Sequence, residues 1–405
     1  MSGSDRAPLA IVGAGLGGLA LALALQRAGA NAVLFERASE LNEVGAGIQM
    51  GPNVMRRLQS WGLGGALQSR VARPRGLNAR DARQGDVLAT MPFDASFEQR
   101  FGAPYATIHR ADLQSVLLQA VQSGGQTDLR LNTTACALQF QDDGLTLKFN
   151  PITKTEPETW SGDALVGADG LWSQIRQQHW GDGQPLPTGH LAYRALAPQS
   201  LLPERLRSQD VTVWMGEHLH LVTYPVRGGE WLNLVLLVQA HRPLADPVPG
   251  WDQVRSPDEL AADLRHAMRG CCSAVRDVVG LIENWRMWPL YARGIVSSPV
   301  QMARGRVALL GDAAHPMLPY LAQGAGMAIE DADCLARHWA SSALSSEQRL
   351  AAYAQERWER NARVQNRSRR NGAVFHATGV VRWGRNLSLR LLGSALLDQP
   401  WLYAG

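Results

Sequence analysis

The chain has 405 residues, of which 45% are hydrophobic and 19% are charged, and its formal net charge is +4 at pH 7. This length predicts two closely packed domains plus an extension, and the composition is typical of a soluble globular protein. No apolar run is long enough to cross a bilayer. An arginine-rich stretch over residues 357–370 has helical spacing, and we interpret it as a solvated helix face. We therefore expect neither a membrane span nor a nucleic-acid partner.

The four cysteines include no CxxC pair, which is typical of reduced thiols in a cytoplasm. The N-terminal residues pass directly into a predicted strand, without the basic and apolar regions of a signal peptide. No set of His, Cys or carboxylate residues has the spacing of metal ligands. We therefore expect a cytoplasmic protein without a metal site.

The chain opens with a strand, a glycine-rich turn, a helix and a second strand. Residues 9–12 and 32–35 are short apolar runs, and residues 19–27 between them are rich in Ala and Leu. This order predicts a βαβ unit that begins a parallel sheet. Residues 164–168 and 307–310 are expected to be later strands of that sheet. The longer extended segments between residues 187 and 288 predict an inserted antiparallel sheet.

The glycine-rich turn GAGLGG follows the first strand directly. Gly13 permits the tight turn, Gly15 lets the backbone approach a pyrophosphate, and Gly18 allows close packing of helix on strand. Leu16 lies in the same turn, where the helix N-terminus supplies N–H groups and a positive dipole. Glu36 ends the next strand and can accept hydrogen bonds from a ribose. The pattern predicts a dinucleotide site and fits FAD and NAD equally.

Two later motifs favour FAD. Asp169 and Asp312 each follow a predicted strand, and an Asp at that end of a parallel strand faces the ligand crevice, so Asp312 could bind a ribityl chain. A glycine-rich loop then precedes a helix, whose N-terminus would stabilise the negative charge of a reduced flavin. The residues assigned to the FAD site in these two motifs are Asp169, Asp312, Gly324, Ala325, Gly326 and Met327.

The three motifs together, GAGLGG with Glu36, ADG at 168–170 and GDAAHP at 311–316, resemble those of the flavoprotein aromatic hydroxylases, which are single-component FAD-dependent monooxygenases. The similarity extends over nearly the whole chain and is greatest to 3-hydroxybenzoate 6-hydroxylase and salicylate hydroxylase. It implies tightly but non-covalently bound FAD, and NAD(P)H as a transient co-substrate with NADH favoured. It further implies that O2 hydroxylates a small phenolic aromatic acid through a flavin C4a-hydroperoxide, and a homodimer is a further expectation.

The resemblance also implies the architecture. The expected fold class is α/β, with a Rossmann-like FAD-binding domain on a parallel sheet, interleaved with an antiparallel-sheet substrate domain and followed by C-terminal helices. The FAD-binding domain is predicted at 1–75, 106–186 and 287–343, the substrate domain at 76–105 and 187–286, and the helical extension at 344–405. Further FAD contacts implied by the resemblance are Arg37, Gly47, Ile48, Gln49, Arg110 and Pro319.

A phenol is far easier to hydroxylate as its phenolate, so the reaction needs a base and a water-poor pocket. In the segment EHLHLVTYPV, alternation places His218, His220, Val222 and Tyr224 on one strand face. The resemblance implies that His220 takes the phenolic proton and that Tyr224 is its hydrogen-bonding and orienting partner. His218 receives no such role.

Tyr105, Arg75 and Pro319 fall on substrate-site positions of the family. The chain departs from the gentisate-forming hydroxylases at two of them, since Pro319 replaces a Gln and Arg75 replaces an acidic residue. Arg75 or Arg194 could bind a substrate carboxylate. Two alternatives stay open, which are a hydroxylase of an N-heteroaromatic such as a hydroxynicotinate, and a flavin-binding redox sensor without oxygenase turnover.

Overall fold

The computed structural model describes residues 8–41, 46–151, 158–240 and 256–404. A six-stranded sheet of order β17-β18-β11-β1-β2-β7 forms the core of one half. All its pairings are parallel except that of β17 with β18. The strands predicted at 9–12, 32–35, 164–168 and 307–310 all lie in this sheet. Its members are β1 (Leu9–Val12), β2 (Ala32–Phe35), β7 (Thr127–Arg130), β11 (Leu165–Gly167), β17 (Ala303–Arg304) and β18 (Val307–Leu309).

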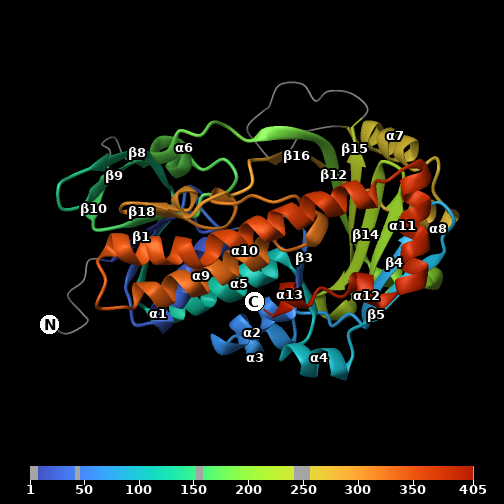
Figure 1. Ribbon diagram of the computed structural model, residues 1–405, viewed down its shortest axis with the longest axis horizontal. Helices are drawn as coiled ribbons and strands as arrows, with labels where there is room; N and C mark the ends of the chain where they lie inside the picture. Colours follow the sequence, from blue (N-terminus) through green and yellow to red (C-terminus); the bar gives the residue numbers. More distant parts are fainter. Residues whose placement is uncertain (1–7, 42–45, 152–157, 241–255, 405) are drawn as a thin grey trace.

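The central strands of this sheet are apolar throughout because they are buried, with helices packed on them and with Phe149 and Trp160 of a smaller sheet lying against Phe35 of β2. Residues of β1, β2, β11 and β18 are buried in one core together with the apolar sides of α1 and α9. Figure 1 shows these helices stacked against the sheet, with α10 lying over α9. The covering helices are α1 (Leu16–Arg27), α5 (Arg110–Gly124), α9 (Gly324–Trp339) and α10 (Ser346–Phe375).

A seven-stranded sheet of order β16-β12-β15-β14-β13-β4-β5 forms the other half. It is antiparallel except for the pair β13 and β4, which confirms the antiparallel sheet expected between 187 and 288. Its last strand runs to Ala292, beyond the expected boundary at 286. Its members are β4 (Gly76–Asp81), β5 (Val87–Pro92), β12 (Leu186–Pro198), β13 (Val211–Gly216), β14 (Leu219–Val226), β15 (Trp231–Gln239) and β16 (Arg286–Ala292).

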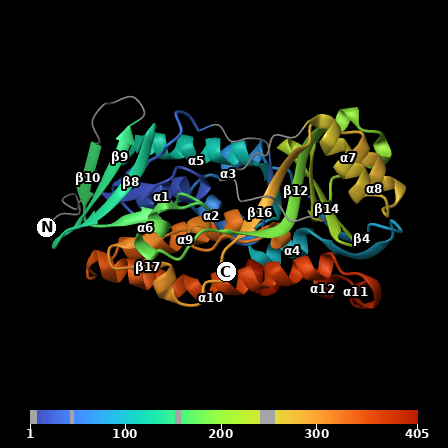
Figure 2. The same ribbon diagram turned by 90° about the horizontal axis from the view of Figure 1, so that it is seen from above.

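The two faces of this second sheet have different partners. Leu219 and Leu221 of β14 pack with apolar residues of α7 (Pro257–Ala267) and α8 (Ser273–Gly280), which lie at the outer end of the molecule in Figure 2. The alternate residues of β14 therefore point to the opposite face, toward the rest of the chain. His218 is not one of them, because it lies before the strand begins and has a φ of 60°.

Smaller elements complete the fold. β3 (Gly47–Met50) pairs with β6 (Ala106–His109), and β8 (Thr133–Phe140), β9 (Leu145–Pro151) and β10 (Glu158–Gly162) form a separate antiparallel sheet. The remaining helices are α2 (Pro52–Ser60), α3 (Gly64–Gln68), α4 (Ala95–Phe101), α6 (Gln174–Trp180), α11 (Gly379–Leu392), α12 (Ser394–Leu397) and α13 (Pro400–Tyr403).

The C-terminal helices bridge the two halves. In both views α10 runs from beside the first sheet to the second, where α11 follows (Figures 1 and 2). This arrangement confirms the predicted α/β class with C-terminal helices, while the exact domain boundaries stay predictions. No helix in the described ranges is both long enough and apolar enough to cross a membrane.

The interpretation of residues 357–370 as a solvated helix face is wrong at its first arginines. Arg357 is 5% exposed, and its guanidinium binds Glu330 at 2.8 Å and Asp331 at 2.8 Å. Arg360 binds Glu330 at 2.6 Å. Both carboxylates are buried on α9, and a buried carboxylate requires a nearby cation. The arginines are therefore part of the contact between α9 and α10.

Candidate active site

The glycine-rich turn between β1 and α1 has a shape that only glycine permits. Gly13 has a φ of 102°, and a Cβ on it would lie 2.5 Å from the carbonyl oxygen of Ala168. A Cβ on Gly18 would lie 1.9 Å from the oxygen of Gly13. At Gly15, by contrast, nothing lies within 4 Å of the Cβ position, so open space adjoins the backbone there. No side chain caps α1, which begins at Leu16. This combination fits the pyrophosphate of a dinucleotide.

Glu36 is held beside this turn. Its carboxylate accepts hydrogen bonds from the backbone N–H of Ala14 at 2.7 Å and of Ala38 at 2.9 Å. Each carboxylate oxygen keeps a second lone pair, so ribose hydroxyls can still be accepted. Arg37 follows at the surface and is exposed. The two residues thus lie where the adenosine half of a dinucleotide is expected.

Asp169 follows β11 and has two different carboxylate oxygens. Oδ2 accepts hydrogen bonds from the N–H groups of Gln174 at 2.7 Å and Ile175 at 3.2 Å, so it caps α6. Oδ1 is buried and has no hydrogen-bond partner in the described part of the chain. Burial raises the pKa of the carboxyl, although hydrogen bonds oppose this. An unpaired buried oxygen costs roughly 1–3 kcal/mol, so this atom fits a contact with a bound ligand.

Arg176 connects the second motif to the third. It is 4% exposed, and its Nη1 donates to the carbonyl oxygens of Ala313 at 3.0 Å and Ala314 at 2.6 Å. No role was predicted for Arg176 from the sequence. Its signal was weak, because an arginine in a first helical turn is usually exposed. The contact holds the turn after β18 in place.

Asp312 lies in that turn, in the 3₁₀ element Gly311–Ala313. Its side chain is solvent-exposed, yet burial raises the pKa of its carboxyl, while the Arg110 guanidinium and His315 lower it. The backbone N–H of Arg110, at the start of α5, donates to the carbonyl oxygen of Ala46 at 2.8 Å. The structure therefore brings Asp312 and Arg110 together, as a shared ligand requires.

The N-terminus of α9 lies beside Asp312. A Cβ on Gly324 would be 4.0 Å from Oδ1 of Asp312. No side chain caps this helix, since the Gln323 amide oxygen instead accepts from Asn53 at 3.2 Å. Gly324 and Ala325 are partly exposed, whereas Gly326 and Met327 are buried. Free N–H groups and the positive end of the helix are thus available for an anionic flavin.

β3 contains the residues expected beside the flavin, and it contacts the seven-stranded sheet. The N–H of Gly47 donates to Oδ1 of Asn233 on β15 at 2.7 Å, and a Cβ on Gly47 would be 2.5 Å from the ring of Tyr224. Ile48 and Gln49 follow and are partly exposed. Asn233 was missed from the sequence, although a single Asn in the apolar run LNLVLLV was a signal.

Tyr105 lies next to the same segment. Its hydroxyl donates to the amide oxygen of Gln49 at 2.7 Å, and its ring stacks on Phe93 with centroids 4.3 Å apart. It also belongs to an apolar cluster with Tyr224 and Met327. Tyr105 and Tyr224, which were expected at the substrate, and Met327, which was expected at the flavin, therefore lie in one cluster.

Arg194 on β12 is a partly exposed cation near Tyr224, with its Nε buried. Burial lowers the pKa of its guanidinium, which lies over the ring of Trp288 at 5.3 Å. Its Nε is buried, and no described residue accepts its hydrogen bond. Burial also raises the pKa of the Tyr224 hydroxyl, although Arg194 opposes this. Tyr224 therefore remains protonated and can donate a hydrogen bond, and Arg194 has an unused donor for a carboxylate.

Arg75 lies apart from this group. Its side chain is 73% exposed, and its Nε binds Asp210 at 3.1 Å. It lies just before β4, and its backbone pairs with Gln209 and Phe93. Of the two arginines considered for a substrate carboxylate, the structure brings only Arg194 to the other site residues.

His220 is 1% exposed and does not bond to Tyr224. Its Nδ1 hydrogen-bonds to Nε2 of His376 at 2.8 Å, and its Nε2 is buried without a partner among the described residues. Four residues along a strand span about 13 Å. The predicted bond from Tyr224 to His220 is therefore wrong, although both share one face of β14 and could contact opposite ends of one small molecule.

The loop after the third motif adds residues that the sequence did not indicate. Pro319 begins the 3₁₀ element Pro319–Leu321 and is partly exposed. Tyr320 follows with its ring 5.2 Å from that of His220, and its hydroxyl hydrogen-bonds to Nδ1 of His190. His190, Tyr320 and His376 come from three distant segments, so no local pattern could have grouped them around His220.

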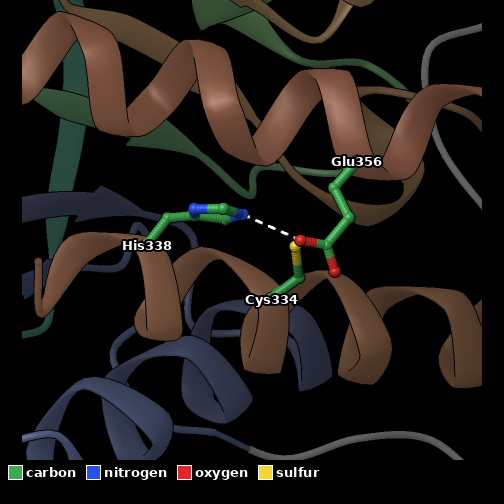
Figure 3. Close-up of side chains that lie close together, drawn as sticks. All are labelled: Cys334, His338 and Glu356. Carbon is green, nitrogen blue, oxygen red and sulfur yellow. Dashed lines mark hydrogen bonds and ion pairs between the residues drawn. The ribbon is translucent and has the colours of Figure 1, made fainter.

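Cys334, His338 and Glu356 form another close cluster, between α9 and α10 (Figure 3). One ligand atom from each lies within 4.8 Å of the others. Nε2 of His338 lies 2.9 Å from Glu356, and Arg337 binds the same carboxylate at 2.6 Å. Burial raises the pKa of Glu356, but bonds from Arg337 and His338 bring it down to about 2. The contacts of Arg337 and His338 on α9 with Glu356 on α10 account for this cluster, and we assign no metal to it.

Comparison with known proteins gives consistent matches over most of the chain. The family described as FAD binding domain matches residues 6–368. The 3-hydroxybenzoate 6-hydroxylase of Polaromonas naphthalenivorans is 35% identical over 379 residues, covering 94% of this chain and 90% of the relative. The 6-hydroxynicotinate 3-monooxygenase of Bordetella bronchiseptica is 33% identical over 374 residues, covering 92% of each. A salicylate hydroxylase substrate complex superposes with a TM-score of 0.79 at 25% identity, covering 99% of this chain and 97% of that one.

Proposed function

The chain belongs to the FAD binding domain family, and from this premise we propose that it hydroxylates a small phenolic aromatic acid with FAD, NAD(P)H and O2. FAD is its cofactor, and the enzyme is a flavoprotein monooxygenase. The resemblance to aromatic hydroxylases that the motifs indicated is confirmed by the relatives. A hydroxybenzoate or a salicylate is the proposed type of substrate.

The observation that carries the proposal is the contact of Gly47 with Tyr224. Gly47 lies on the segment expected beside the flavin ring, and Tyr224 lies on the second sheet with His220. A substrate bound beside this contact, on the face of β14 that carries Tyr224 and His220, would lie next to the flavin segment and reach both proposed catalytic side chains. Such a junction is needed because the oxygen must reach a ring carbon directly.

The proposed roles follow from protonation and charge. FAD, when bound, supplies the activation of O2. Nε2 of His220 is buried without a partner among the described residues, and burial with the neighbouring His376 and His190 lowers the pKa of His220, so the ring is neutral and Nε2 is the proposed acceptor of the phenolic proton. Tyr224 donates from its protonated hydroxyl and orients the ring, and Arg194 binds the carboxylate with its unused Nε donor. Buried apolar residues around Tyr105 and Met327 exclude water.

NAD(P)H is the proposed electron donor, with NADH favoured. The sequence has a single GxGxxG turn, and the match to the FAD binding domain family supports FAD as the dinucleotide that occupies it. The nicotinamide cofactor would therefore bind only transiently while it reduces the flavin.

An N-heteroaromatic acid such as a hydroxynicotinate is the second candidate substrate. It is supported by the similarity to 6-hydroxynicotinate 3-monooxygenase and by Pro319, which stands where the gentisate-forming hydroxylases carry Gln. A carboxylate on such a ring would bind Arg194 in the same way. The two candidates differ only in the ring.

A panel of hydroxybenzoates and hydroxypyridine carboxylates separates these functions. The purified yellow enzyme should oxidise NADH several-fold faster with one acid, and that acid should be recovered as its hydroxylated product. Stimulation by a hydroxypyridine acid alone would transfer the assignment to the second candidate. No stimulation by any acid, with FAD bound, would favour a redox sensor.

His220→Ala tests the proposed base. The variant should retain FAD and its reduction by NADH, but hydroxylation should fall by roughly 10²–10⁴-fold, which is the usual contribution of a positioned base. Product formation near the wild-type rate would show that another group takes the proton.

A homodimer is also proposed, and an apolar stripe on α11 supports it. Val380, Trp383, Leu387 and Leu391 recur at helical spacing and are 84, 68, 39 and 74% exposed. The opposite side of α11 is occupied, since Arg385 and Leu389 are buried. A contiguous exposed apolar surface of this kind marks an interaction site.

A further inference from the structure

The C-terminal extension reaches the proposed base through one side chain. His376 caps the C-terminal end of α10 and is 7% exposed, and its Nε2 lies 2.8 Å from Nδ1 of His220. The two residues are 156 positions apart in the chain. Both rings also contact Tyr320, with centroids 5.2 and 5.7 Å away. His220 is therefore oriented by a helix that lies outside both sheets.

Only one proton can occupy the bond between the two imidazoles. If His220 donates from Nδ1–H, its Nε2 carries a lone pair and can accept a phenolic proton. If His376 donates instead, Nε2 of His220 carries the hydrogen and cannot act as a base. The direction of this single hydrogen bond therefore decides whether His220 can do the proposed chemistry.

The surroundings of His376 keep its ring neutral, as an acceptor must be. Burial and the neighbouring groups His190, His218 and Arg385 lower the pKa of His376 to about 3. Arg385 also donates to the carbonyl oxygens of Val374 at 3.0 Å and Phe375 at 2.9 Å, so it fixes the end of α10. The ring of His190 stacks on that of His376 with centroids 5.2 Å apart.

We infer that His376 is a positioning residue of the active site, which holds His220 in the Nδ1–H form and leaves Nε2 to accept the substrate's phenolic proton. The inference rests on the proposed function of His220. In the step, the substrate O–H bond breaks and an Nε2–H bond forms on His220. The imidazolium so produced is stabilised by its Nδ1–H bond to His376, and the substrate becomes a phenolate.

Two substitutions of His376 separate hydrogen bonding from packing. His376→Leu fills the position but accepts no hydrogen bond, whereas His376→Gln offers an amide oxygen near the place of Nε2. His218→Asn is a matched control, since it removes a nearby histidine that bonds to Gln239 at 2.9 Å rather than to His220, and burial, the largest cause of the lowered pKa of His376, stays in place. Asn also tolerates the φ of 60° at that position.

Two readouts are needed, of which one does not depend on turnover. The first is the hydroxylation rate of the FAD-loaded enzyme. The second is the ultraviolet difference spectrum of bound 3-hydroxybenzoate, or of the panel acid that binds most tightly, followed against pH. Phenol and phenolate absorb differently, so this spectrum gives the pKa of the bound phenol.

His376→Leu should lower the hydroxylation rate roughly 10- to 100-fold, which is part of the effect of losing the base, and should raise the pKa of the bound phenol. His376→Gln should restore most of the hydroxylation rate and bring the pKa of the bound phenol back toward the wild-type value. His218→Asn should match the wild type in both measurements. Equal losses in the Leu and Gln variants, or an unchanged phenol pKa in the Leu variant, would overturn the inference. If His376→Leu fails to fold, the Gln variant and its spectrum still decide.

The His220→Ala variant distinguishes the two levels of the proposal. If His220→Ala loses hydroxylation and His376→Leu does not, the base is supported and the positioning role is wrong. If His220→Ala hydroxylates normally, the proposed base is wrong, whatever His376 does.

Discussion

At the scale of single residues, Gly47 is a position where the contact between β3 and the seven-stranded sheet leaves no room for a side chain. A Cβ there would lie 2.5 Å from Cε2 of Tyr224 and 2.8 Å from Cγ of Asn233. Gly47→Ala should therefore displace Tyr224 while leaving the glycine turn intact. We expect FAD to remain bound and hydroxylation to fall on the order of 10²-fold, as a misplacement of about 1 Å can cause.

The measurement compares the amount of product formed with the amount of NADH consumed. If the substrate ring is displaced, NADH is oxidised without hydroxylation of the substrate. Gly65→Ala is the control, since no atom lies within 4 Å of a Cβ at that exposed position. A Gly47→Ala enzyme with unchanged product yield would mean that Tyr224 does not orient the substrate.

Residue roles that depend on local backbone geometry could be predicted from the sequence. The placement of Gly13, Gly18 and Glu36 follows from a strand, a turn and a helix that are contiguous in the chain. His376 and Asn233 could not be predicted in this way. Each acts on a residue more than 150 positions away, and such a contact depends on packing that no short window contains.

At the scale of elements, the joint between α9 and α10 depends on Arg357. Its guanidinium neutralises Glu330 and Asp331, and both carboxylates are fully desolvated. Although burial raises the pKa of Glu330, Arg360 and Arg357 bring it down to about 2. Arg357→Met would leave two buried charges with too few partners. We expect it to lower the free energy of unfolding by roughly 3–5 kcal/mol.

Denaturant unfolding followed by circular dichroism measures this loss. Arg370→Met is the matched control on the same helix, because Arg370 is exposed and should change the stability by less than about 0.5 kcal/mol. Similar losses in both variants would show that the arginines act through helix propensity and not through the buried pairs.

The two sheets could be predicted as elements because their patterns differ. Short apolar runs that end in glycine turns indicated β1, β11 and β18, and longer segments indicated β14 and β15. The buried side of α10 could not be predicted, since arginines at helical spacing are usually solvent-exposed. Their burial depends on acidic residues of α9, which only the packing of the two helices reveals.

At the scale of the whole molecule, the last residues of the chain bind side chains of helices that lie earlier in the sequence. The final segment returns to the first half, where the carbonyl oxygen of Tyr403 accepts from Arg56 at 2.9 Å and that of Trp401 accepts from Arg360 at 2.9 Å. α10 joins the half built on the six-stranded sheet to the half built on the seven-stranded sheet, and it ends at His376 beside His220, the proposed base. The C-terminal helices are therefore expected to affect catalysis as well as stability.

The same extension presents the apolar stripe of α11, so the oligomeric state can be tested there. Trp383→Glu places a charge at the middle of the stripe, where a second copy would have to desolvate it. We expect the wild type to have twice the chain mass of 44.1 kDa in light scattering after gel filtration, and the variant to shift toward 44.1 kDa.

Leu201→Glu is the control for that experiment, because Leu201 is 79% exposed and lies outside the stripe, in the 3₁₀ element Gln199–Leu201. It should leave the mass unchanged. A wild type of single-chain mass at micromolar concentration would contradict the homodimer. A Trp383→Glu variant that stays dimeric would instead place the interface elsewhere, since a buried charge opposite an apolar face costs several kcal/mol and could not be accommodated. The hydroxylation rate should follow FAD content in both variants, because the substituted side chains are exposed whereas His220 and Tyr224 are buried.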